Sequence, residues 1–281
     1  MRIGSRSPIW SRLIQIVGFS ALGALGASAD EPAMVPEIRP GVLAGYLAAS
    51  ATVDSAALLP PPPAEGSAAL ALDQEISRTD LALQGTPRWT LAGMDADLSF
   101  PAAAGDFSCA LNAPVTLQDT PRLYQMLRRI MTDAGRATGS AKDKYNRTRP
   151  FMVNNAPTCS PGSDDALRKN GSYPSGHTSI GWAWALVLAE ASPDRSEAII
   201  ARGRAFGESR LICNVHWESD VIEGRFVGAA TVARLHAEPA FLADLEAAKS
   251  ELAAARAKNL APQRDCKFEA EALQQQPLQA P

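Results

Sequence analysis

Residues 178–191 are the stretch that most constrains the fold of this chain, because they are apolar on nearly every side of a helix. Trp182, Trp184, Leu186 and Leu188 stand there among small and apolar neighbours. A helix without a polar face must be covered on all sides by other parts of the protein. We therefore predict that residues 178–191 form the central helix of a bundle.

Other stretches predict the helices that surround this centre. Apolar residues recur at helical spacing in two of them, namely Leu70, Leu72, Ile76 and Leu83, and then Leu123, Met126, Leu127, Ile130 and Met131. The second set follows Asp119-Thr120-Pro121, a cap followed by a proline of the kind that begins a helix. Further helices are expected over residues 196–210, 216–236 and 240–258. Because alternating strand patterns are nearly absent, we predict an all-α fold, a single helical bundle domain over residues 70–258.

The N-terminal residues have the pattern of an export signal. Arginines make the start basic, and an apolar stretch over residues 13–25 precedes Ala27-Ser28-Ala29, which has the small-residue pattern of a cleavage site. We predict a signal peptide over residues 1–29, cleaved after Ala29, and a periplasmic or secreted protein. A retained N-terminal anchor is the alternative. No other stretch is apolar enough for a membrane span, so none is expected in the mature form.

The segments that flank the predicted bundle lack helical periodicity. Residues 60–63 are four consecutive prolines, which favour an extended polyproline conformation. Residues 30–69 are therefore predicted to be extended, either as a linker or as a rigid strap lying on the core. Residues 259–281 are rich in Gln, Pro and Ala and are predicted to form a disordered tail, part of which Cys266 could tether.

The cysteines are Cys109, Cys159, Cys213 and Cys266. An even number in an exported chain predicts one or two disulfides, and the sequence leaves all three full pairings open. Cys213 lies close to Arg210 and His216, but we interpret it as structural, because a catalytic thiol needs a base of its own.

The net charge of −3 gives no general reason to expect nucleic-acid binding, so an anion site must come from local clusters of Lys and Arg. Lys142 and Arg149 flank a polar segment that ends at Pro150. Arg149 offers a planar fork for phosphate oxygens, and Lys142 offers a point charge. Taken alone this pair is weak evidence, because basic residues in loops are usually solvated.

A loop containing Pro174-Ser175-Gly176-His177 runs directly into the apolar helix. Unpaired N–H groups at a helix start favour anions, so Ser175 and Gly176 are candidates for holding a phosphate. Gly176 has no side chain and permits close approach. His177 would then stand beside the phosphate and protonate a departing oxygen. The alternative is an ordinary loop in which Ser175 caps the helix.

The third segment contains Ser209, Arg210, His216 and Asp220. His216 and Asp220 are four residues apart on a predicted helix, which places both side chains on one face. A carboxylate bound to one ring nitrogen fixes the tautomer and leaves the other nitrogen free to attack. Arg210 precedes this helix and supplies a third cation.

Together these segments contain what phosphoryl transfer requires: a nucleophile, an acid and a clamp of positive charge. His216 is the candidate nucleophile, and His177 is the candidate acid. No metal or other cofactor is expected, because fixed cations and backbone amides can stabilise the charge of the transition state. Nor does the sequence contain a dense cluster of Asp and His that suggests metal ligands.

These residues match the signature of the type 2 phosphatidic acid phosphatase (PAP2) superfamily, K-x6-R-P, P-S-G-H and S-R-x5-H-x3-D, at every motif position. They stand here at residues 142–150, 174–177 and 209–220. Within the superfamily the chain resembles the bacterial class A non-specific acid phosphatases over residues 40–255. The segments that carry this closer likeness are residues 58–66, 85–89, 171–178 and 213–220.

The resemblance implies an exported helical enzyme that hydrolyses many small phosphomonoesters, such as nucleotides and sugar phosphates, at acidic pH without a metal. It implies that His216 forms a phosphohistidine, that Asp220 orients it and that His177 protonates the leaving group. It assigns phosphate binding to Lys142, Arg149, Ser175, Gly176 and Arg210. Members of this class often form dimers, and some transfer phosphate to alcohols.

Two rival functions share parts of this pattern. A vanadium-dependent haloperoxidase would use the same motif residues to hold vanadate, but the short chain and the class A features favour a phosphatase. A non-catalytic phosphate-binding protein would need neither an acid nor an oriented nucleophile.

Four further residues are not assigned to catalysis. Asp95 and Asp97 resemble a pair of metal ligands, but we interpret them as capping or solvated residues. His236 is expected to be structural, and Trp217 is expected to pack in the core or line the pocket.

Overall fold

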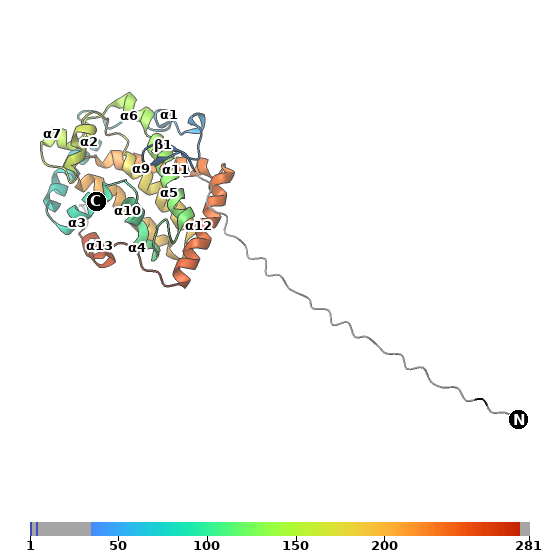
Figure 1. Ribbon diagram of the computed structural model, residues 1–281. Coiled ribbons are helices and arrows are strands. Elements are labelled where there is room, and N and C mark those ends of the chain that lie inside the picture. The colour runs from blue at the N-terminus through green and yellow to red at the C-terminus, as the bar shows by residue number, and fades with distance from the viewer. Residues whose placement is uncertain (2–3, 5–34, 276–281) are drawn as a thin grey trace. The chain divides into compact units, whose positions relative to one another are not determined.

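The computed structural model of the protein describes residues 1, 4 and 35–275, and helices dominate this part of the chain (Figure 1). Within it, the one sheet is a hairpin of two short antiparallel strands, β1 (Glu37–Arg39) and β2 (Val42–Leu43). The all-α prediction is therefore confirmed. The predicted signal peptide lies outside the described residues, apart from residues 1 and 4.

The helices differ widely in length along the chain. The α-helices are α1 (Ser55–Leu58), α2 (Ala68–Asp80), α3 (Pro87–Asp95), α4 (Ser108–Leu111), α5 (Pro121–Arg136), α6 (Gly139–Tyr145), α7 (Pro150–Asn154), α8 (Asp164–Leu167), α9 (Gly176–Ala191), α10 (Ser196–Ile212), α11 (Glu218–Leu235), α12 (Pro239–Ala257) and α13 (Cys266–Leu273). Short 3-10 helices cover Ala49–Ala51 (η1), Leu81–Leu83 (η2), Ala103–Phe107 (η3), Pro161–Ser163 (η4) and Pro193–Arg195 (η5).

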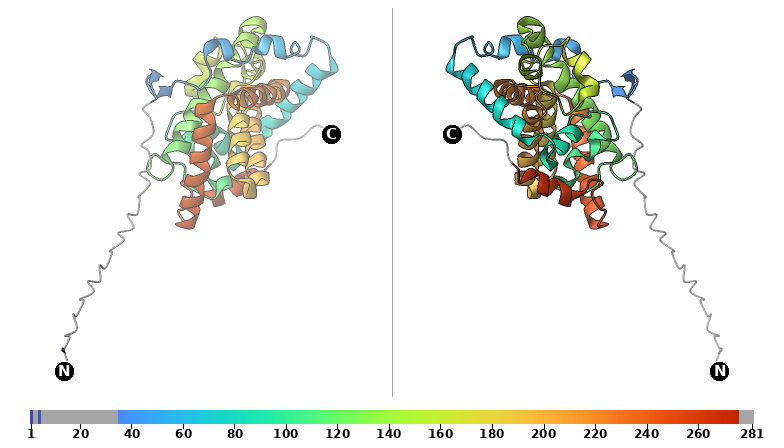
Figure 2. Two further views of the ribbon diagram at one scale, coloured as in Figure 1. Left: turned by 90° about the vertical axis from the view of Figure 1, so that its right-hand side faces the viewer. Right: turned by 90° about the vertical axis from the view of Figure 1, so that its left-hand side faces the viewer.

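Helix α9 lies at the centre of the bundle, as its apolar surface predicts. It packs against α5, α10, α11 and α12 (Figure 1 and Figure 2). Trp184 of α9 is completely buried, and its indole N–H donates to the carbonyl oxygen of Leu127 in α5 at 2.9 Å. Because α9 buries apolar side chains on nearly every side, it supplies hydrophobic contacts to each helix around it.

Glycines allow the neighbouring helices to approach α9 closely. A Cβ atom on Gly181 of α9 would stand 2.2 Å from Cδ1 of Phe206 in α10. A Cβ atom on Gly228 of α11 would stand 2.5 Å from the carbonyl oxygen of Ser179 in α9. Both separations are far shorter than a van der Waals contact, so the close packing of these helices requires glycine at both positions.

Two predicted helix starts differ from the structure, and capping explains both. Helix α9 begins at Gly176 because the side chain of Ser175 accepts the backbone N–H of Thr178 at 3.2 Å. Helix α11 begins at Glu218, so the prediction that His216 lies on this helix is wrong. The carboxylate of Asp220 instead accepts the backbone N–H of Trp217 at 2.9 Å and sets the start of α11 after His216.

The segment before α2 is held on the bundle by hydrogen bonds. The carboxylate of Asp133 accepts the backbone N–H of Tyr46 at 2.7 Å, and the Tyr46 hydroxyl donates to Asp244 at 2.6 Å. Further along the chain, the hydroxyl of Tyr173 donates to the carbonyl oxygen of Pro60 at 2.7 Å. These contacts hold the described part of residues 30–69 against the bundle. It is not extended throughout, as had been predicted, because it contains η1 and α1.

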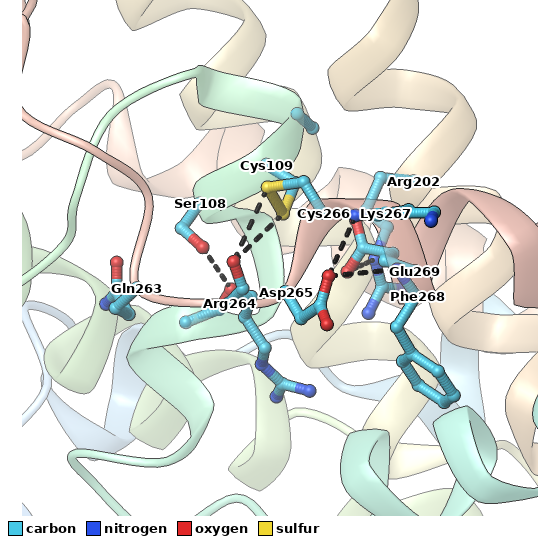
Figure 3. The surroundings of a disulfide bond; sticks show 12 residues. Ser108, Cys109, Arg202, Gln263, Arg264, Asp265, Cys266, Lys267, Phe268 and Glu269 are labelled. Atoms are coloured by element: carbon cyan, nitrogen blue, oxygen red, sulfur yellow. Dashed lines mark hydrogen bonds and ion pairs between the residues drawn. A yellow bond between two sulfur atoms is a disulfide. The ribbon is translucent and has the colours of Figure 1, made fainter.

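The predicted disordered tail instead contains α13, and this is a correction to residues 259–275. The carboxylate of Asp265 caps α13 by accepting the backbone N–H groups of Lys267 and Phe268, each at 3.0 Å. A disulfide joins Cys266 at the start of α13 to Cys109 in α4 (Figure 3). This covalent tether, 157 residues apart in sequence, provides order that the composition of the tail does not indicate.

Every cysteine is paired, which selects one of the three pairings left open by the sequence. The second disulfide joins Cys159 to Cys213, where α10 ends. Cys213 is therefore structural, as predicted. Among the described residues, no helix combines the length and the apolar character that a membrane crossing requires.

Replacing Gly181 with Ala is expected to lower the free energy of unfolding by about 1–3 kcal/mol, because the added methyl group would press against the Phe206 ring. Urea denaturation measures this difference. The matched control is Gly139→Ala in α6, where an added Cβ meets nothing within 4 Å. Equal stability of the two variants would contradict the close packing of α9 and α10.

Candidate active site

The three motif segments meet at the end of the bundle where α9 begins. Lys142 comes from α6, Arg149 precedes α7, and Arg210 lies in the last turn of α10. All three cations are buried, at 9%, 2% and 1% exposure. A Cβ atom on Gly176 would stand 3.9 Å from Cε of Lys142, so the loop of the second motif lies against the first motif.

His216 reaches this point through the tight turn that follows α10. Asn214 in this turn has the left-handed conformation, with a φ of 61°. The backbone N–H of His216 then donates to the carbonyl oxygen of Arg210 at 3.3 Å. Arg149 holds the turn from the other side by donating from Nη1 to the carbonyl oxygen of Val215 at 2.9 Å. The local backbone thus brings His216 beside two of the cations.

The hydrogen bonds of the His216 ring fix its tautomer. Nδ1 lies 3.2 Å from Oδ2 of Asp220, and Nε2 lies 3.0 Å from Nη1 of Arg149. A guanidinium can only donate, so Nε2 carries a lone pair and Nδ1 carries the proton. Burial, together with the positive charge of Arg149 and Lys142, holds the pKa of His216 well below its usual value. The imidazole is therefore neutral, with an unprotonated nitrogen facing the cations.

Asp220 is fully buried and is held by an arginine that the sequence analysis did not single out. Arg147 donates from Nη1 to Oδ1 of Asp220 at 2.7 Å and from Nη2 to Oδ2 of Asp73 at 2.7 Å. Burial raises the pKa of Asp220, and Arg147 opposes that shift. The position of Arg147 between Lys142 and Pro150 could have indicated a role in the site. Nothing in the sequence around Asp73 of α2 indicates one.

The three cations are short of negative partners. Lys142 donates from Nζ to the carbonyl oxygen of Gly171 at 2.7 Å, and burial and Arg149 lower its pKa to about 7. Burial lowers the pKa of Arg149 to about 10. Burial, with repulsion from Arg149, lowers the pKa of Arg210 to about 9. Within residues 35–275, Nε and Nη1 of Arg210 are buried without a hydrogen-bond partner. An anion between these side chains would supply the missing negative charge.

The start of α9 contributes backbone N–H groups at the same place. The Ser175 N–H is already used, because it donates to the carbonyl oxygen of Asp220 at 2.9 Å, and the Ser175 side chain caps the helix. The N–H groups of Gly176 and His177 have no partner in the described part of the chain. These two groups, at the positive end of the helix dipole, can bind an anion.

His177 is oriented by a backbone carbonyl rather than a carboxylate. Its Nε2 donates to the carbonyl oxygen of Ala96, just past α3, at 3.1 Å. A carbonyl oxygen only accepts, so the proton of the neutral ring is on Nε2 and Nδ1 is left unprotonated. Burial, followed by the charge of Arg210, holds the pKa of His177 well below its usual value. His177 also contributes to the lowered pKa of His216, so the two rings share one electrostatic environment.

Comparison with known proteins places the chain in a family. Residues 126–239, which include all three motifs, match the PAP2 superfamily. A non-specific acid phosphatase of Providencia stuartii is 46% identical over 209 residues, which cover 74% of this chain and 84% of that protein. One from Salmonella typhimurium is 46% identical over 202 residues, covering 72% and 81%. The acid phosphatase of Zymomonas mobilis is 40% identical over 198 residues, covering 70% and 75%.

The chain belongs to the bacterial non-specific acid phosphatase family. The resemblance drawn from the motifs is therefore confirmed. The family match lies within residues 126–239, so α13 and the N-terminal strap fall outside it.

The remaining candidates do not join the site of this family member. Asp97 is exposed, in agreement with a solvated role, and accepts the backbone N–H of Ser99 at 2.9 Å in a local turn. Asp95 is neither capping nor solvated, as had been expected, but buried in an ion pair with Arg202. Trp217 packs in the core, and its indole N–H donates to the carbonyl oxygen of Thr148 at 2.8 Å. No group of three or more His, Cys, Asp or Glu in the described residues is placed to hold a metal ion.

Inorganic phosphate is expected to raise the Tm of the protein, because it would bind the under-neutralised cations. At a phosphate concentration 100 times the Kd, the free energy of unfolding would rise by ~2.7 kcal/mol. Arg210→Met should shrink the phosphate-dependent shift, whereas Arg78→Met on the exposed side of α2 should keep it in full. Thermal denaturation with and without phosphate measures both. A full shift in the Arg210 variant would show that phosphate binds elsewhere.

Proposed function

We propose that this protein is an acid phosphatase that hydrolyses small phosphate monoesters through a covalent phosphohistidine on His216. The observation that carries the proposal is the position of the His216 ring, with Nε2 3.0 Å from Nη1 of Arg149 and Nδ1 3.2 Å from Oδ2 of Asp220. A buried and neutral imidazole beside three cations combines a nucleophile with a site for a dianion.

In the first step, Nε2 of His216 forms a bond to phosphorus, and the bond from phosphorus to the ester oxygen breaks. Arg149, Arg210 and Lys142 face the charge on the phosphoryl oxygens, together with the N–H groups of Gly176 and His177. The pKa of Lys142 near 7 means that this side chain is mostly charged under acidic conditions. Asp220 stabilises the positive charge that develops on the imidazole of His216.

His177 supplies the proton for the leaving oxygen. Once substrate is bound, the charge of the phosphate raises the affinity of this imidazole for a proton, and Nδ1 is the nitrogen that carries it. In the second step the neutral His177 takes a proton from water, whose oxygen attacks phosphorus and releases His216. An alcohol in place of that water would give phosphate transfer instead of hydrolysis.

The proposed reaction uses no metal, because the fixed cations and the helix N-terminus supply the positive charge. We further propose that the chain is exported with residues 1–29 as its signal peptide, which is compatible with its two disulfides. Assembly into dimers stays a prediction.

His216→Ala is expected to abolish turnover, because no nucleophile remains to form the intermediate. The wild-type protein, quenched in alkali within milliseconds of mixing with labelled substrate, should retain label in an alkali-stable and acid-labile bond. A chelator should leave the rate of hydrolysis unchanged. Near-normal turnover by His216→Ala would contradict the assignment of the nucleophile.

His177→Ala is expected to lower the rate most for substrates with poor leaving groups. General acid catalysis raises the rate by about 10²–10⁴-fold. p-Nitrophenolate is a good leaving group and gains little from a proton, whereas an alkoxide leaves only when it is protonated. The ratio of kcat for p-nitrophenyl phosphate to kcat for an alkyl phosphate measures this effect. Equal losses on both substrates would remove His177 from the role of acid.

Arg147→Met is expected to make activity fail first at low pH. Without the arginine the pKa of Asp220, already raised by burial, rises further, and the protonated carboxyl no longer accepts Nδ1–H of His216. The ratio of variant to wild-type kcat/KM should therefore fall as pH falls, and Arg147→Lys should restore part of it. A ratio that stays constant with pH would mean that Arg147 acts only on structure.

A further inference from the structure

Helix α13, outside the family match, takes part in a buried ion-pair network. Oε2 of Glu269 in α13 lies 3.3 Å from Nε of Arg202 in α10, an ion pair without the geometry of a hydrogen bond. Arg202 also pairs with Oδ1 of Asp95, the last residue of α3, at 2.5 Å. The side chains of Glu269, Arg202 and Asp95 are 7%, 2% and 0% exposed, so each charge depends on the others for its neutralisation.

Two further links fasten α13 at its start. The disulfide from Cys266 to Cys109 joins it to α4, and Arg264 pairs with the fully buried Asp106 of η3. Figure 3 shows Glu269 and Arg202 on the α13 side of this disulfide, with Arg264 below it. Residues 264–273 are therefore attached covalently to α4 and electrostatically to α10 and η3.

The same network ends at two residues that neighbour the site. Oδ2 of Asp95 accepts the hydroxyl of Ser209 at 2.6 Å, and Ser209 directly precedes Arg210. On the other side, Asp95 directly precedes Ala96, whose carbonyl oxygen accepts Nε2–H of His177. Asp95 thus binds the residue next to Arg210 and is itself next to Ala96, whose carbonyl oxygen orients His177.

We propose that α13 is a positioning element for the acid step, in which Glu269 holds Arg202 and Asp95 so that the Ala96 carbonyl aims His177. This inference rests on the proposed function of His177. Within residues 35–275, the His177 ring makes one hydrogen bond, which its Nε2–H donates to the carbonyl oxygen of Ala96. A small displacement of the end of α3 would therefore turn the ring away from the leaving oxygen.

Removing Glu269 should act on α3 rather than on α13 alone. Arg202 would keep Asp95 as its close carboxylate but lose the partner on its Nε side. A buried arginine short of one partner shifts toward the remaining carboxylate or toward solvent, and either movement shifts Asp95 and Ala96. Ser209 would be disturbed through the same carboxylate, with less effect on the nucleophile His216.

The test compares Glu269→Gln with Glu271→Gln, an exposed control on the same helix. We expect Glu269→Gln to lower kcat for an alkyl phosphate about tenfold, and kcat for p-nitrophenyl phosphate by less than about twofold, because only the alkoxide needs the acid. Glu271→Gln should match wild type on both substrates. Glu269→Asp, which keeps the charge, should recover part of the loss.

Equal losses on both substrates, or no loss on either, would overturn the positioning role. If Glu269→Gln does not fold, the Cys109→Ser, Cys266→Ser double variant is judged by the same criterion, since it frees α13 but keeps Glu269. Labelled phosphoenzyme in the wild type separates the two proposals. Its absence would defeat the proposed function. If it is present and Glu269→Gln lowers kcat equally on both substrates, only the positioning role of α13 is defeated.

Discussion

The site depends on three cations that are buried together without enough negative charge to neutralise them. Lys142 and Arg149 come from the first motif and Arg210 from the third, and burial lowers the pKa of each. The shortest hydrogen bonds of Lys142 and Arg149 go to carbonyl oxygens, which carry no net charge. The fold tolerates this cost because the helices around α9 fix the backbone that holds the cations. A bound phosphate dianion would neutralise these charges and so stabilise the folded protein.

The same burial prepares the two imidazoles. Desolvation and nearby positive charge keep His216 and His177 neutral at pH values where a solvated histidine is charged. Opposite acceptors then give them opposite tautomers, since Asp220 binds Nδ1 of His216 and Ala96 binds Nε2 of His177. One ring therefore offers Nε2 for attack and the other offers Nδ1 for proton transfer. Charge, tautomer and direction all follow from contacts that the fold determines.

Local patterns predicted the fold class and the motif residues, but not the long-range pairs. The apolar surface of α9 was enough to place it at the centre, because such a surface has only one stable environment. The sequence correctly predicted that His216 pairs with Asp220, but the reason was wrong. A helix cap, and not a shared helix face, brings the two side chains together. Asp73 and α13 were missed because their partners, Arg147 and Cys109, are distant in sequence.

The ionisation state of His216 tests this account most directly. The chain has only three histidines, so nitrogen-15 NMR of the labelled imidazoles can follow each ring through a pH titration. At pH 6 the free protein should show His216 neutral with its proton on Nδ1, and His177 neutral with its proton on Nε2. His236, whose pKa is raised by its bond to Val232 and by Glu190, should be charged. A charged His216 at that pH, or one protonated only on Nε2, would contradict the account.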